Sequence, residues 1–232
     1  EATSKAIKTG WISTAGKDVN KFEKKICKIT KAKYAVAINS GTSSIHLALV
    51  ASNVKRGDEV LVQSITYLAS FQAISSCGAT PKACDINLSS LNIDLNDAKK
   101  RITKNTKAIM PVHYAGDPGE INKVYKFAKK YNLRVIEDAA HAFGSKVNGE
   151  YIGSFGDIVC FSFDGIKNIT SGEGGCVITD DISVLNKIKD ARILGVKEDS
   201  EARFRGQRKW EFEVTDQGWR YHMSDIMAAI GL

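Results

Sequence analysis

The sequence is poor in several features that mark particular protein classes. It has only three prolines and no internal repeat, low-complexity tract or proline-rich linker, so one domain is expected. No apolar run approaches the roughly 20 residues that a membrane-spanning helix requires. Its five cysteines form no CxxC pair and most lie in apolar runs, which favours reduced core thiols over a zinc site or a disulfide framework. No signal-peptide pattern opens the chain, and we therefore expect a cytoplasmic protein that is not bound to a membrane.

Acidic residues are outnumbered, but the excess of positive charge does not indicate a nucleic-acid-binding protein. The formal net charge is +7 and the isoelectric point is near 9.1. The densest lysine clusters, at 21–28 and 123–130, lie on helix-patterned segments without interleaved aromatic residues, so we interpret them as solvated helix faces. A positive potential would also attract an anionic small substrate, such as a nucleotide-linked sugar.

The sequence does contain a clear alternation of short apolar runs and helical segments. Strands are expected at 34–38, 59–64, 80–86, 107–114 and 133–140, and helices at 43–52, 66–78, 95–102 and 121–131. This order predicts an α/β fold with a mainly parallel sheet flanked by helices on both faces. The strand-like runs at 157–163 and 174–180 have no helix between them, which makes them candidates for an antiparallel pair. Ligands of such sheets bind beyond the carboxyl ends of the strands.

A run of small polar residues, NSGTSS at 39–44, follows the first of these strands and opens a helix. A helix N-terminus has unpaired backbone N–H groups and a partial positive charge, which suit a phosphate. The alternative is an ordinary helix cap, in which Ser40 or Thr42 binds its own backbone. The run is neither a Gly-x-Gly-x-x-Gly nor a Walker loop, so dinucleotides and nucleoside triphosphates are not indicated.

Three ionisable residues also follow buried strands. Asp138 and His141 lie at the end of one strand, and Lys167 lies between another strand and a glycine-rich turn at 172–175. Asp138 either faces a ligand or caps the following turn, and His141 is equally consistent with a structural role. A lysine in a desolvated pocket has a lowered pKa and becomes a nucleophilic amine, whereas the alternative is one more surface lysine.

Together these features match what pyridoxal phosphate (PLP) requires. The helix N-terminus would hold its phosphate, Asp138 would keep its ring nitrogen protonated, and Lys167 would form the Schiff base with it. The combination is more specific than any one of the three features, because all of them are expected at the same sheet edge.

A series of motifs runs along the whole chain: GWISTAGKDVNKFE, NSGTSSIHLAL, GDEVLVQSITYLAS, IEDAAHAFGS, GSFGDIVCFSF, KNITSGEGG and WRYHMSDIMAAIGL. In this order they resemble the motifs of the DegT/DnrJ/EryC1/StrS family of PLP-dependent sugar aminotransferases. The resemblance implies the fold-type-I architecture of aspartate aminotransferase. It also implies that residues 1–232 form the PLP-binding large domain, and that a smaller C-terminal domain follows Leu232.

The resemblance further implies a role for individual residues. Lys167 matches the Schiff-base lysine, which also moves the proton between cofactor and sugar carbon, and the branch that deoxygenates sugars has histidine there. Asp138 matches the partner of the ring nitrogen, and His141 matches the polar residue near the ring hydroxyl. Tyr67 matches the aromatic residue that stacks on the ring. The positions that match phosphate contacts are Thr42, Ser43 and Ser162.

One position departs from the family pattern. Many relatives have an asparagine in the C-terminal motif that reaches the phosphate of the neighbouring subunit, and here the matching residue is Arg220. An arginine can make that contact through its charged fork. The resemblance therefore implies a homodimer in which Arg220 completes the partner's site.

The expected reaction is transamination of a nucleotide-linked keto-deoxysugar, most often a 4-keto-6-deoxy sugar in this family. Glutamate is the expected amino donor, pyridoxamine phosphate the intermediate form of the cofactor, and surface polysaccharide or glycoconjugate synthesis the destination. One alternative is another fold-type-I PLP enzyme, such as a cysteine desulfurase or an aldolase, which the GWISTAG and GEGG segments disfavour. The other is a non-catalytic PLP-binding regulator.

Overall fold

The structure is a computed structural model that describes residues 1–14, 16–197, 213–214 and 216–232. Ala15, within the first of the family-like motifs, lies outside these residues. The helices of the described chain are α1 (Ala2–Thr9), α2 (Lys17–Thr30), α3 (Gly41–Ala51), α4 (Leu68–Ser76), α5 (Leu95–Arg101), α6 (Ile121–Tyr131), α7 (Ile182–Ala191) and α9 (Asp225–Gly231), with a 3-10 turn at Tyr114–Gly116. The strands are β1 (Tyr34–Ile38), β2 (Glu59–Gln63), β3 (Thr80–Cys84), β4 (Thr106–Met110), β5 (Arg134–Asp138), β6 (Lys146–Val147), β7 (Glu150–Tyr151), β8 (Ile158–Ser162) and β9 (Gly175–Thr179).

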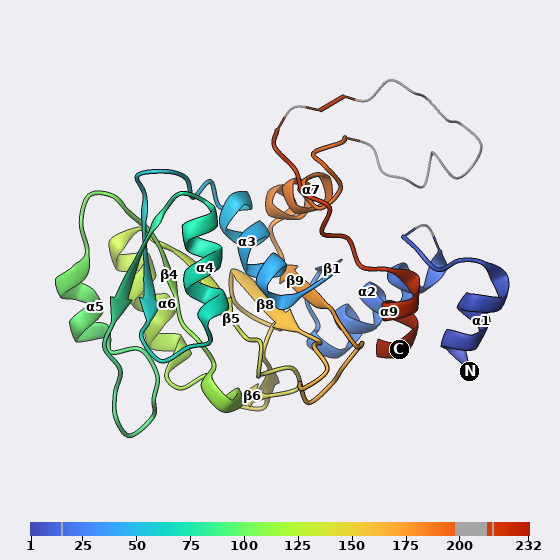
Figure 1. The fold of residues 1–232 in the computed structure, drawn as a ribbon. Coiled ribbons are helices and arrows are strands. Elements are labelled where there is room, and N and C mark those ends of the chain that lie inside the picture. The colour runs from blue at the N-terminus through green and yellow to red at the C-terminus, as the bar shows by residue number, and fades with distance from the viewer. Residues whose placement is uncertain (15, 198–212, 215) are drawn as a thin grey trace.

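The main sheet confirms the expected topology. It has seven strands in the order β1-β9-β8-β5-β4-β2-β3. All neighbours are parallel except at β9, which is antiparallel to both β8 and β1. The pair without an intervening helix, β8 and β9, is therefore antiparallel as predicted. A single reversed strand leaves the carboxyl ends of the other six at one edge of the sheet (Figure 1).

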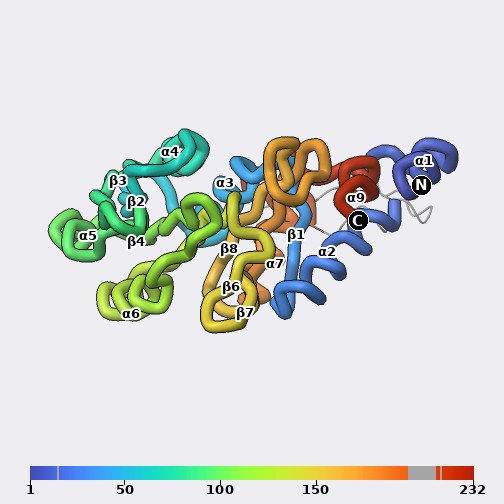
Figure 2. The backbone as a smooth tube through the Cα atoms, turned by 90° about the horizontal axis from the view of Figure 1, so that it is seen from below, coloured from blue at the N-terminus to red at the C-terminus, as the bar shows by residue number. Residues whose placement is uncertain are grey.

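Helices cover both faces of this sheet. Side chains alternate along each strand, so Val36 and Ile38 of β1 pack with α3 and α7, whereas Ala35 and Ala37 pack with α2. At the other end of the sheet, α4 and α6 lie on opposite sides of β2 and β4 (Figure 2). Helix α3 is almost wholly buried, which explains why it is apolar nearly all round.

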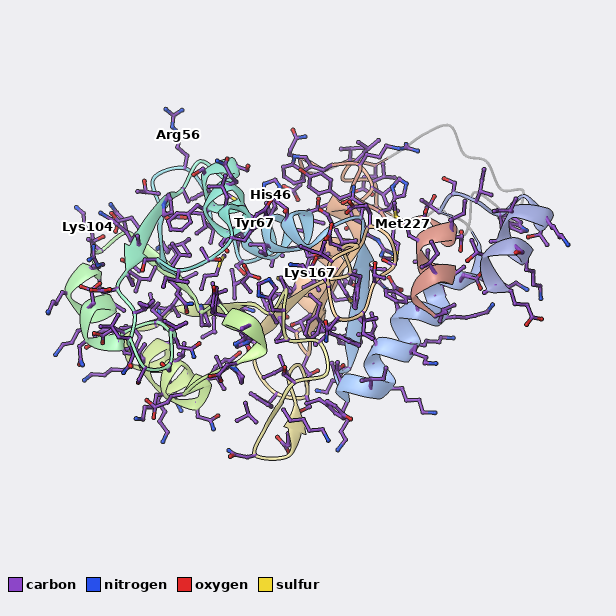
Figure 3. The ribbon with its side chains drawn as sticks, turned by 60° about the horizontal axis from the view of Figure 1, so that its bottom comes forward. His46, Arg56, Tyr67, Lys104, Lys167 and Met227 are labelled. Carbon is purple, nitrogen blue, oxygen red and sulfur yellow. The ribbon has the colours of Figure 1, made fainter. Side chains whose placement is uncertain are left out.

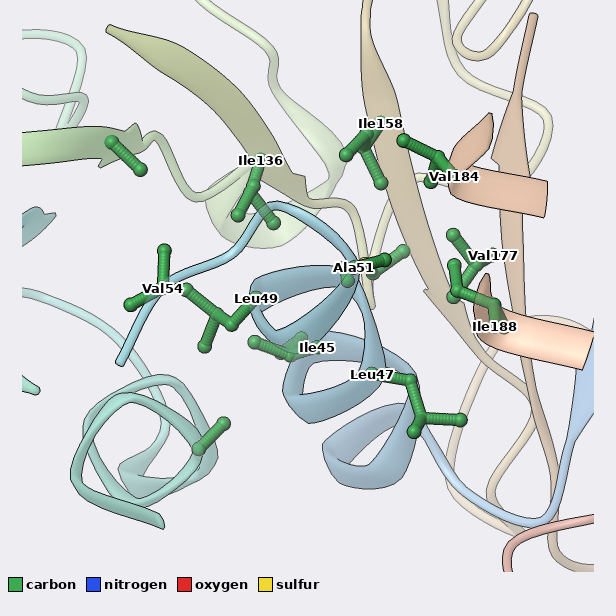
Figure 4. Packing of buried hydrophobic residues seen from close by; sticks show 14 of the residues in the cluster. Ile45, Leu47, Leu49, Ala51, Val54, Ile136, Ile158, Val177, Val184 and Ile188 are labelled. Carbon is green, nitrogen blue, oxygen red and sulfur yellow. The ribbon is translucent and has the colours of Figure 1, made fainter. Parts of the chain in front are cut away.

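The largest core cluster forms between α3 and the middle strands. Leu47 and Leu49 of α3 have no exposed surface and belong to the same cluster as Ile136 of β5 and Ile158 of β8 (Figure 4). Fully burying one such side chain contributes about 1.5–3 kcal/mol. Since residue 41 is the first residue of this helix, the same packing fixes the position of the helix N-terminus over the sheet edge.

Some strands end earlier than the apolar runs suggest. The run at 107–114 predicts a strand to Tyr114, but β4 ends at Met110, because Pro111 has no N–H to continue the ladder. Beyond it, only an isolated parallel bridge joins Val112 to Asp138. Residues 111–114 therefore leave the sheet as a loop beside the end of β5.

Each edge strand of the sheet carries a feature that hinders further pairing. On β1, the Ala37 N–H donates to Glu23 Oε1 (2.9 Å), and Arg192 Nη1 donates to both Glu23 Oε1 and the Ala37 carbonyl oxygen (2.8 Å each). On the opposite edge, β3 contains Pro81, which cannot donate to a neighbouring strand.

One buried carboxylate fastens the N-terminal segment to the C-terminal helix. Helix α2 follows Gly16, which has no side chain with which to cap it. Asp225 in α9 takes that role: its Oδ2 accepts from Gly16 N (2.6 Å), and its Oδ1 accepts from Asp18 N (3.0 Å) and Val19 N (3.3 Å). A Cβ at residue 16 would lie 2.4 Å from Asp225 Cγ, so glycine is required there. The two ends of the described chain therefore lie side by side (Figures 1 and 2).

No helix in the described parts of the chain combines the length and the apolar character needed to cross a membrane.

Candidate functional site

A cavity of about 610 Å³ opens at the carboxyl ends of five strands, β1, β2, β4, β5 and β8. It includes the point between β2 and β4 where the strand order reverses, which is the usual ligand position in such sheets. Six of the residues singled out from the sequence line it together: Thr42, Tyr67, Asp138, His141, Ser162 and Lys167. The other two, Ser43 and Arg220, are not among its lining residues.

The N-terminus of α3 forms one wall of the cavity. Ser40 caps the helix, since its Oγ accepts from Ser43 N (3.1 Å) and bonds to Ser43 Oγ (2.9 Å). The capping alternative is thus correct for Ser40, while Thr42 in the first turn faces the cavity. A Cβ at Gly41 would lie 2.7 Å from Ser162 Cβ, so glycine is what lets the helix start approach the end of β8. The partial positive charge of the helix therefore lies against the cavity.

Strand alternation aims Ser162 at the cavity. Its neighbours Phe161 and Phe163 are 0% and 1% exposed and point to the opposite face, where both rings pack edge-on against Phe143. Because side chains alternate along a strand, Ser162 between them must face α3. Its Oγ also accepts a hydrogen bond from Asp164 N (3.4 Å), the first residue of the loop that contains Lys167.

Asp138 lies at the end of β5 on the floor of the cavity and is 4% exposed. Its Oδ2 accepts from the Ser70 hydroxyl (2.6 Å), and its Oδ1 accepts from Ala140 N (3.2 Å). The second contact is the turn-capping bond that the sequence left open as an alternative. The structure thus brings Asp138 to the cavity and uses it as a cap at the same time.

Lys167 and His141 both line the cavity and lie near enough for their charges to interact. Lys167 is half-buried and is held in a turn in which its N–H donates to the Asp164 carbonyl oxygen (3.0 Å). Partial desolvation lowers the pKa of His141, and the nearby Lys167 ammonium lowers it further, although Asp138 opposes both effects. His141 is therefore neutral near pH 7 and can both donate and accept a hydrogen bond.

Tyr67 is the N-cap residue that directly precedes α4, and it is 76% exposed. An aromatic ring with that much free surface at a cavity is available to cover a flat ligand. Figure 3 places Tyr67 and Lys167 in the central part of the molecule, on the loops that follow β2 and β8.

The structure adds a lining residue that sequence reasoning missed, His113, with Glu137 and Tyr125 behind it. His113 is 1% exposed, and its Nε2 bonds to Glu137 Oε2 (2.6 Å), while Glu137 itself is 0% exposed. Tyr125 donates to the second oxygen of Glu137, and burial together with this carboxylate raises the pKa of Tyr125 well above its usual value. His113 Nδ1 has no partner among the described residues. No sequence signal marked His113, because the predicted strand at 107–114 included it, whereas β4 ends at Met110.

Arg220 lies outside the cavity of its own chain. It is exposed, and its backbone forms a bridge with Ile193. Its neighbours Trp219 and Tyr221 both pack against His46 of α3, with ring centroids 4.7 Å and 5.9 Å away. This aromatic contact holds residues 219–221 on α3. The Arg220 side chain does not line the cavity of its own chain.

The cavity suits PLP in the chemistry of its groups. A helix N-terminus and Ser162 are available for a phosphate, an aromatic ring for stacking, a buried carboxylate for a ring nitrogen and a lysine amine for a carbonyl carbon. A mainly parallel sheet with one reversed strand and this set of residues defines the fold-type-I class of PLP-dependent enzymes.

Comparison with known proteins identifies the family. The chain matches the model of the DegT/DnrJ/EryC1/StrS aminotransferase family over residues 1–232 and belongs to this family of PLP-dependent sugar aminotransferases. It is 40% identical over 237 residues to a GDP-perosamine synthase of Escherichia coli O157:H7, covering 100% of this chain and 61% of the relative. It is 42% identical over 226 residues to an uncharacterized protein of Methanocaldococcus jannaschii, covering 97% of this chain and 58% of that protein.

The fold is also confirmed by solved structures. The crystal structure of DesV from S. venezuelae in complex with a ketimine intermediate has a TM-score of 0.89 to this chain at 30% sequence identity. The match covers 99% of this chain and 58% of DesV, so the chain spans less than two thirds of the length of these relatives.

Proposed function

We propose that the protein transfers the amino group of glutamate to the keto group of a nucleotide-linked deoxysugar, with PLP as its cofactor. A 4-keto-6-deoxy sugar is the proposed acceptor, and the similarity to a GDP-perosamine synthase puts a GDP-linked sugar first among the candidates. The aminated sugar would serve surface polysaccharide or glycoconjugate synthesis. The full-length protein would be a cytoplasmic homodimer in which residues 1–232 form the large domain and a smaller domain follows.

One observation carries the proposal: Lys167 and Asp138 line the same cavity at the start of α3. A lysine and a buried carboxylate in one cavity also occur in other enzymes. Because a helix N-terminus also approaches this cavity, the candidate ligands are those that carry an anionic group as well.

Each residue has a defined task in this reaction. PLP, when bound, supplies an electron sink for negative charge at the carbon that carries the amino group. Lys167 holds the cofactor at rest, and its amine then moves a proton at the substrate carbon. Asp138 would hold the ring nitrogen in its protonated form, and neutral His141 would interact with the ring hydroxyl. Tyr67 covers one face of the ring.

The phosphate contacts are proposed for the start of α3 and for Ser162. Thr42 lines the cavity, which supports a direct phosphate contact for it, whereas the Ser43 amide already donates to the Ser40 cap. We therefore propose that Ser43 supports the phosphate by shaping the helix start. The exposed Arg220 would reach the phosphate of a partner subunit.

The decisive experiment is turnover by the full-length protein with PLP, glutamate and a panel of nucleotide-linked keto-sugars. Formation of an amino sugar is measured by mass spectrometry together with 2-oxoglutarate release. Lys167→Ala is the matched control, since it removes the amine and leaves the rest of the cavity. The expected result is release of 2-oxoglutarate that continues beyond one equivalent of cofactor only when the sugar is present, and that disappears in Lys167→Ala.

Other outcomes select the alternatives. PLP binding without turnover on any sugar would favour a non-catalytic regulator. Conversion of cysteine or retro-aldol cleavage of a hydroxy amino acid, without sugar amination, would favour another fold-type-I enzyme. Near-normal turnover in Asp138→Asn would return Asp138 to a purely structural role.

A further inference from the structure

A chain of three side-chain oxygens connects the cavity wall to the carboxylate on its floor. Thr66 Oγ1 lies 2.7 Å from Ser70 Oγ, and Ser70 Oγ lies 2.6 Å from Asp138 Oδ2. Thr66 is half-buried and lines the cavity, whereas Ser70 has no exposed surface. The chain therefore runs from the cavity inward to Asp138.

The two hydroxyls meet at the start of α4. Thr66 precedes the cap residue Tyr67, Ser70 lies in the first turn of the helix, and their hydroxyl oxygens are 2.7 Å apart. Ser70 N donates to the carbonyl oxygen of Tyr67 (3.3 Å). The first turn of α4 thus presents Tyr67 to the cavity and Ser70 to the end of β5.

The order of the hydrogens along this chain follows from the acceptor at its end. An ionised carboxylate only accepts hydrogen bonds, so the single hydroxyl hydrogen of Ser70 must point to Asp138. Ser70 Oγ can then only accept from Thr66, whose own hydrogen points inward. Ala140 N meanwhile donates to the other carboxylate oxygen, Oδ1 (3.2 Å). Both oxygens of Asp138 are therefore oriented by groups of the protein.

We propose that Ser70, supported by Thr66, is a positioning residue that fixes the orientation of the Asp138 carboxylate towards the ring nitrogen of the cofactor. This rests on the proposed function through the assignment of Asp138. Without the Ser70 hydroxyl, Asp138 Oδ2 loses its donor on a carboxylate that is only 4% exposed. The carboxylate then turns or draws the ring proton more strongly, and the ring becomes a weaker electron sink.

Two matched pairs of variants test the proposal in the full-length protein. Ser70→Ala removes the inner hydroxyl, and Ser70→Thr keeps it. Thr66→Val removes the outer hydroxyl at nearly constant volume, and Thr66→Ser keeps it. The second pair changes a half-buried site, so it remains informative even if a change at the fully buried Ser70 prevents folding.

The readouts separate positioning from simple stabilisation. The first is a pH titration of the visible absorbance of the PLP-loaded protein, which needs no substrate. When the ring nitrogen is less protonated, the pH midpoint of the change in this visible absorbance rises. The midpoint should therefore shift upward in Ser70→Ala and, to a smaller extent, in Thr66→Val. The second is kcat with glutamate, which should fall at least about tenfold in Ser70→Ala, the equivalent of about 1.4 kcal/mol. KM for glutamate should change less than kcat, and Ser70→Thr and Thr66→Ser should restore both readouts.

Each outcome has one meaning. A lower thermal midpoint of unfolding in Ser70→Ala, with an unchanged pH titration and unchanged kcat, would overturn the positioning role. Loss of kcat in Asp138→Asn with full activity in Ser70→Ala would overturn it while leaving the proposed function intact. Absence of any transamination by the unmodified protein would remove the proposed function. The pH titration would still decide whether the Ser70 hydroxyl acts on the bound cofactor.

Discussion

Replacing Asp225 with asparagine should destabilise the protein severely although it changes only one oxygen atom. The Asp225 carboxylate is 1% exposed and accepts three backbone N–H groups at the start of α2, two on Oδ1 and one on Oδ2. An asparagine has one acceptor oxygen. If that oxygen continues to accept from Asp18 N and Val19 N, the amide NH₂ replaces Oδ2. Two donors, this NH₂ and the Gly16 N–H, then face each other where a 2.6 Å hydrogen bond was made.

The size of the effect follows from these contacts. Losing one buried hydrogen bond to a charged acceptor costs about 1.5–3 kcal/mol. Removing a negative charge from a helix N-terminus costs about 0.3–1 kcal/mol more. Together they predict a loss of about 2–4 kcal/mol in the free energy of unfolding. At about 2–4 °C per kcal/mol for a chain of this length, the melting temperature should fall by about 5–15 °C.

Thermal and urea unfolding, followed by circular dichroism, measure the change. The matched control is Asp18→Asn, which neutralises an aspartate in the same helix turn whose side chain pairs with the exposed Lys21 (2.6 Å). This control should lose no more than about 1 kcal/mol relative to the unmodified protein. If Asp225→Asn unfolds at the same temperature as Asp18→Asn, the buried carboxylate does not fasten the two ends of the chain as described.

The other predictions concern the site and its surroundings. Borohydride reduction of the PLP-loaded protein should attach the cofactor to Lys167, and peptide mapping that finds it on another lysine would refute the assignment. Arg220→Ala should weaken PLP binding at least tenfold, since a charge-assisted hydrogen bond contributes about 1.5–3 kcal/mol and 1.4 kcal/mol is a factor of ten. Arg220→Lys should restore only part of it, and mixing Arg220→Ala with Lys167→Ala subunits should regenerate activity if the sites are shared; no recovery would disprove sharing. Burial lowers the pKa of His46, so the unfolded chain takes up a proton that the folded chain excludes. The associated stability is complete above about pH 6.5 and is lost as the pH falls below it. His46→Phe should therefore flatten the dependence of the melting temperature on pH between 7 and 5, and an unchanged dependence would exclude His46 as the cause.

The parts of the fold that could be predicted are those that local sequence determines. Apolar runs of four or five residues separated by helical segments were sufficient to predict the parallel sheet, because each run must be buried on both faces. The missing helix between 157–163 and 174–180 was sufficient to predict the one antiparallel pair at β8 and β9. Strand ends then pointed to the cavity, since parallel strands share their carboxyl edge.

The parts that could not be predicted depend on contacts between distant residues. Ser70 is 68 residues from Asp138, and Gly16 is 209 residues from Asp225. Nothing in the sequence around Ser70 distinguishes it from the other serines of α4, because its role depends on which strand the helix packs against. The role of Ser43 could not be decided either, because a serine-rich run at the start of a helix is equally consistent with a helix cap and with a phosphate site.

The hindered sheet edges have a consequence for the behaviour of the protein at high concentration. An exposed strand with free N–H and C=O groups is a template onto which another chain can add, and such growth ends in fibres or precipitates. Here Glu23 and Arg192 occupy the Ala37 groups on β1, and Pro81 interrupts β3. These groups hinder the addition of a further strand at Ala37 and at Pro81. Loss of the Glu23 carboxylate would remove the charged partner of a buried Arg192 guanidinium and free the Ala37 N–H at the same time. That N–H at the edge of β1 would then be available to another chain.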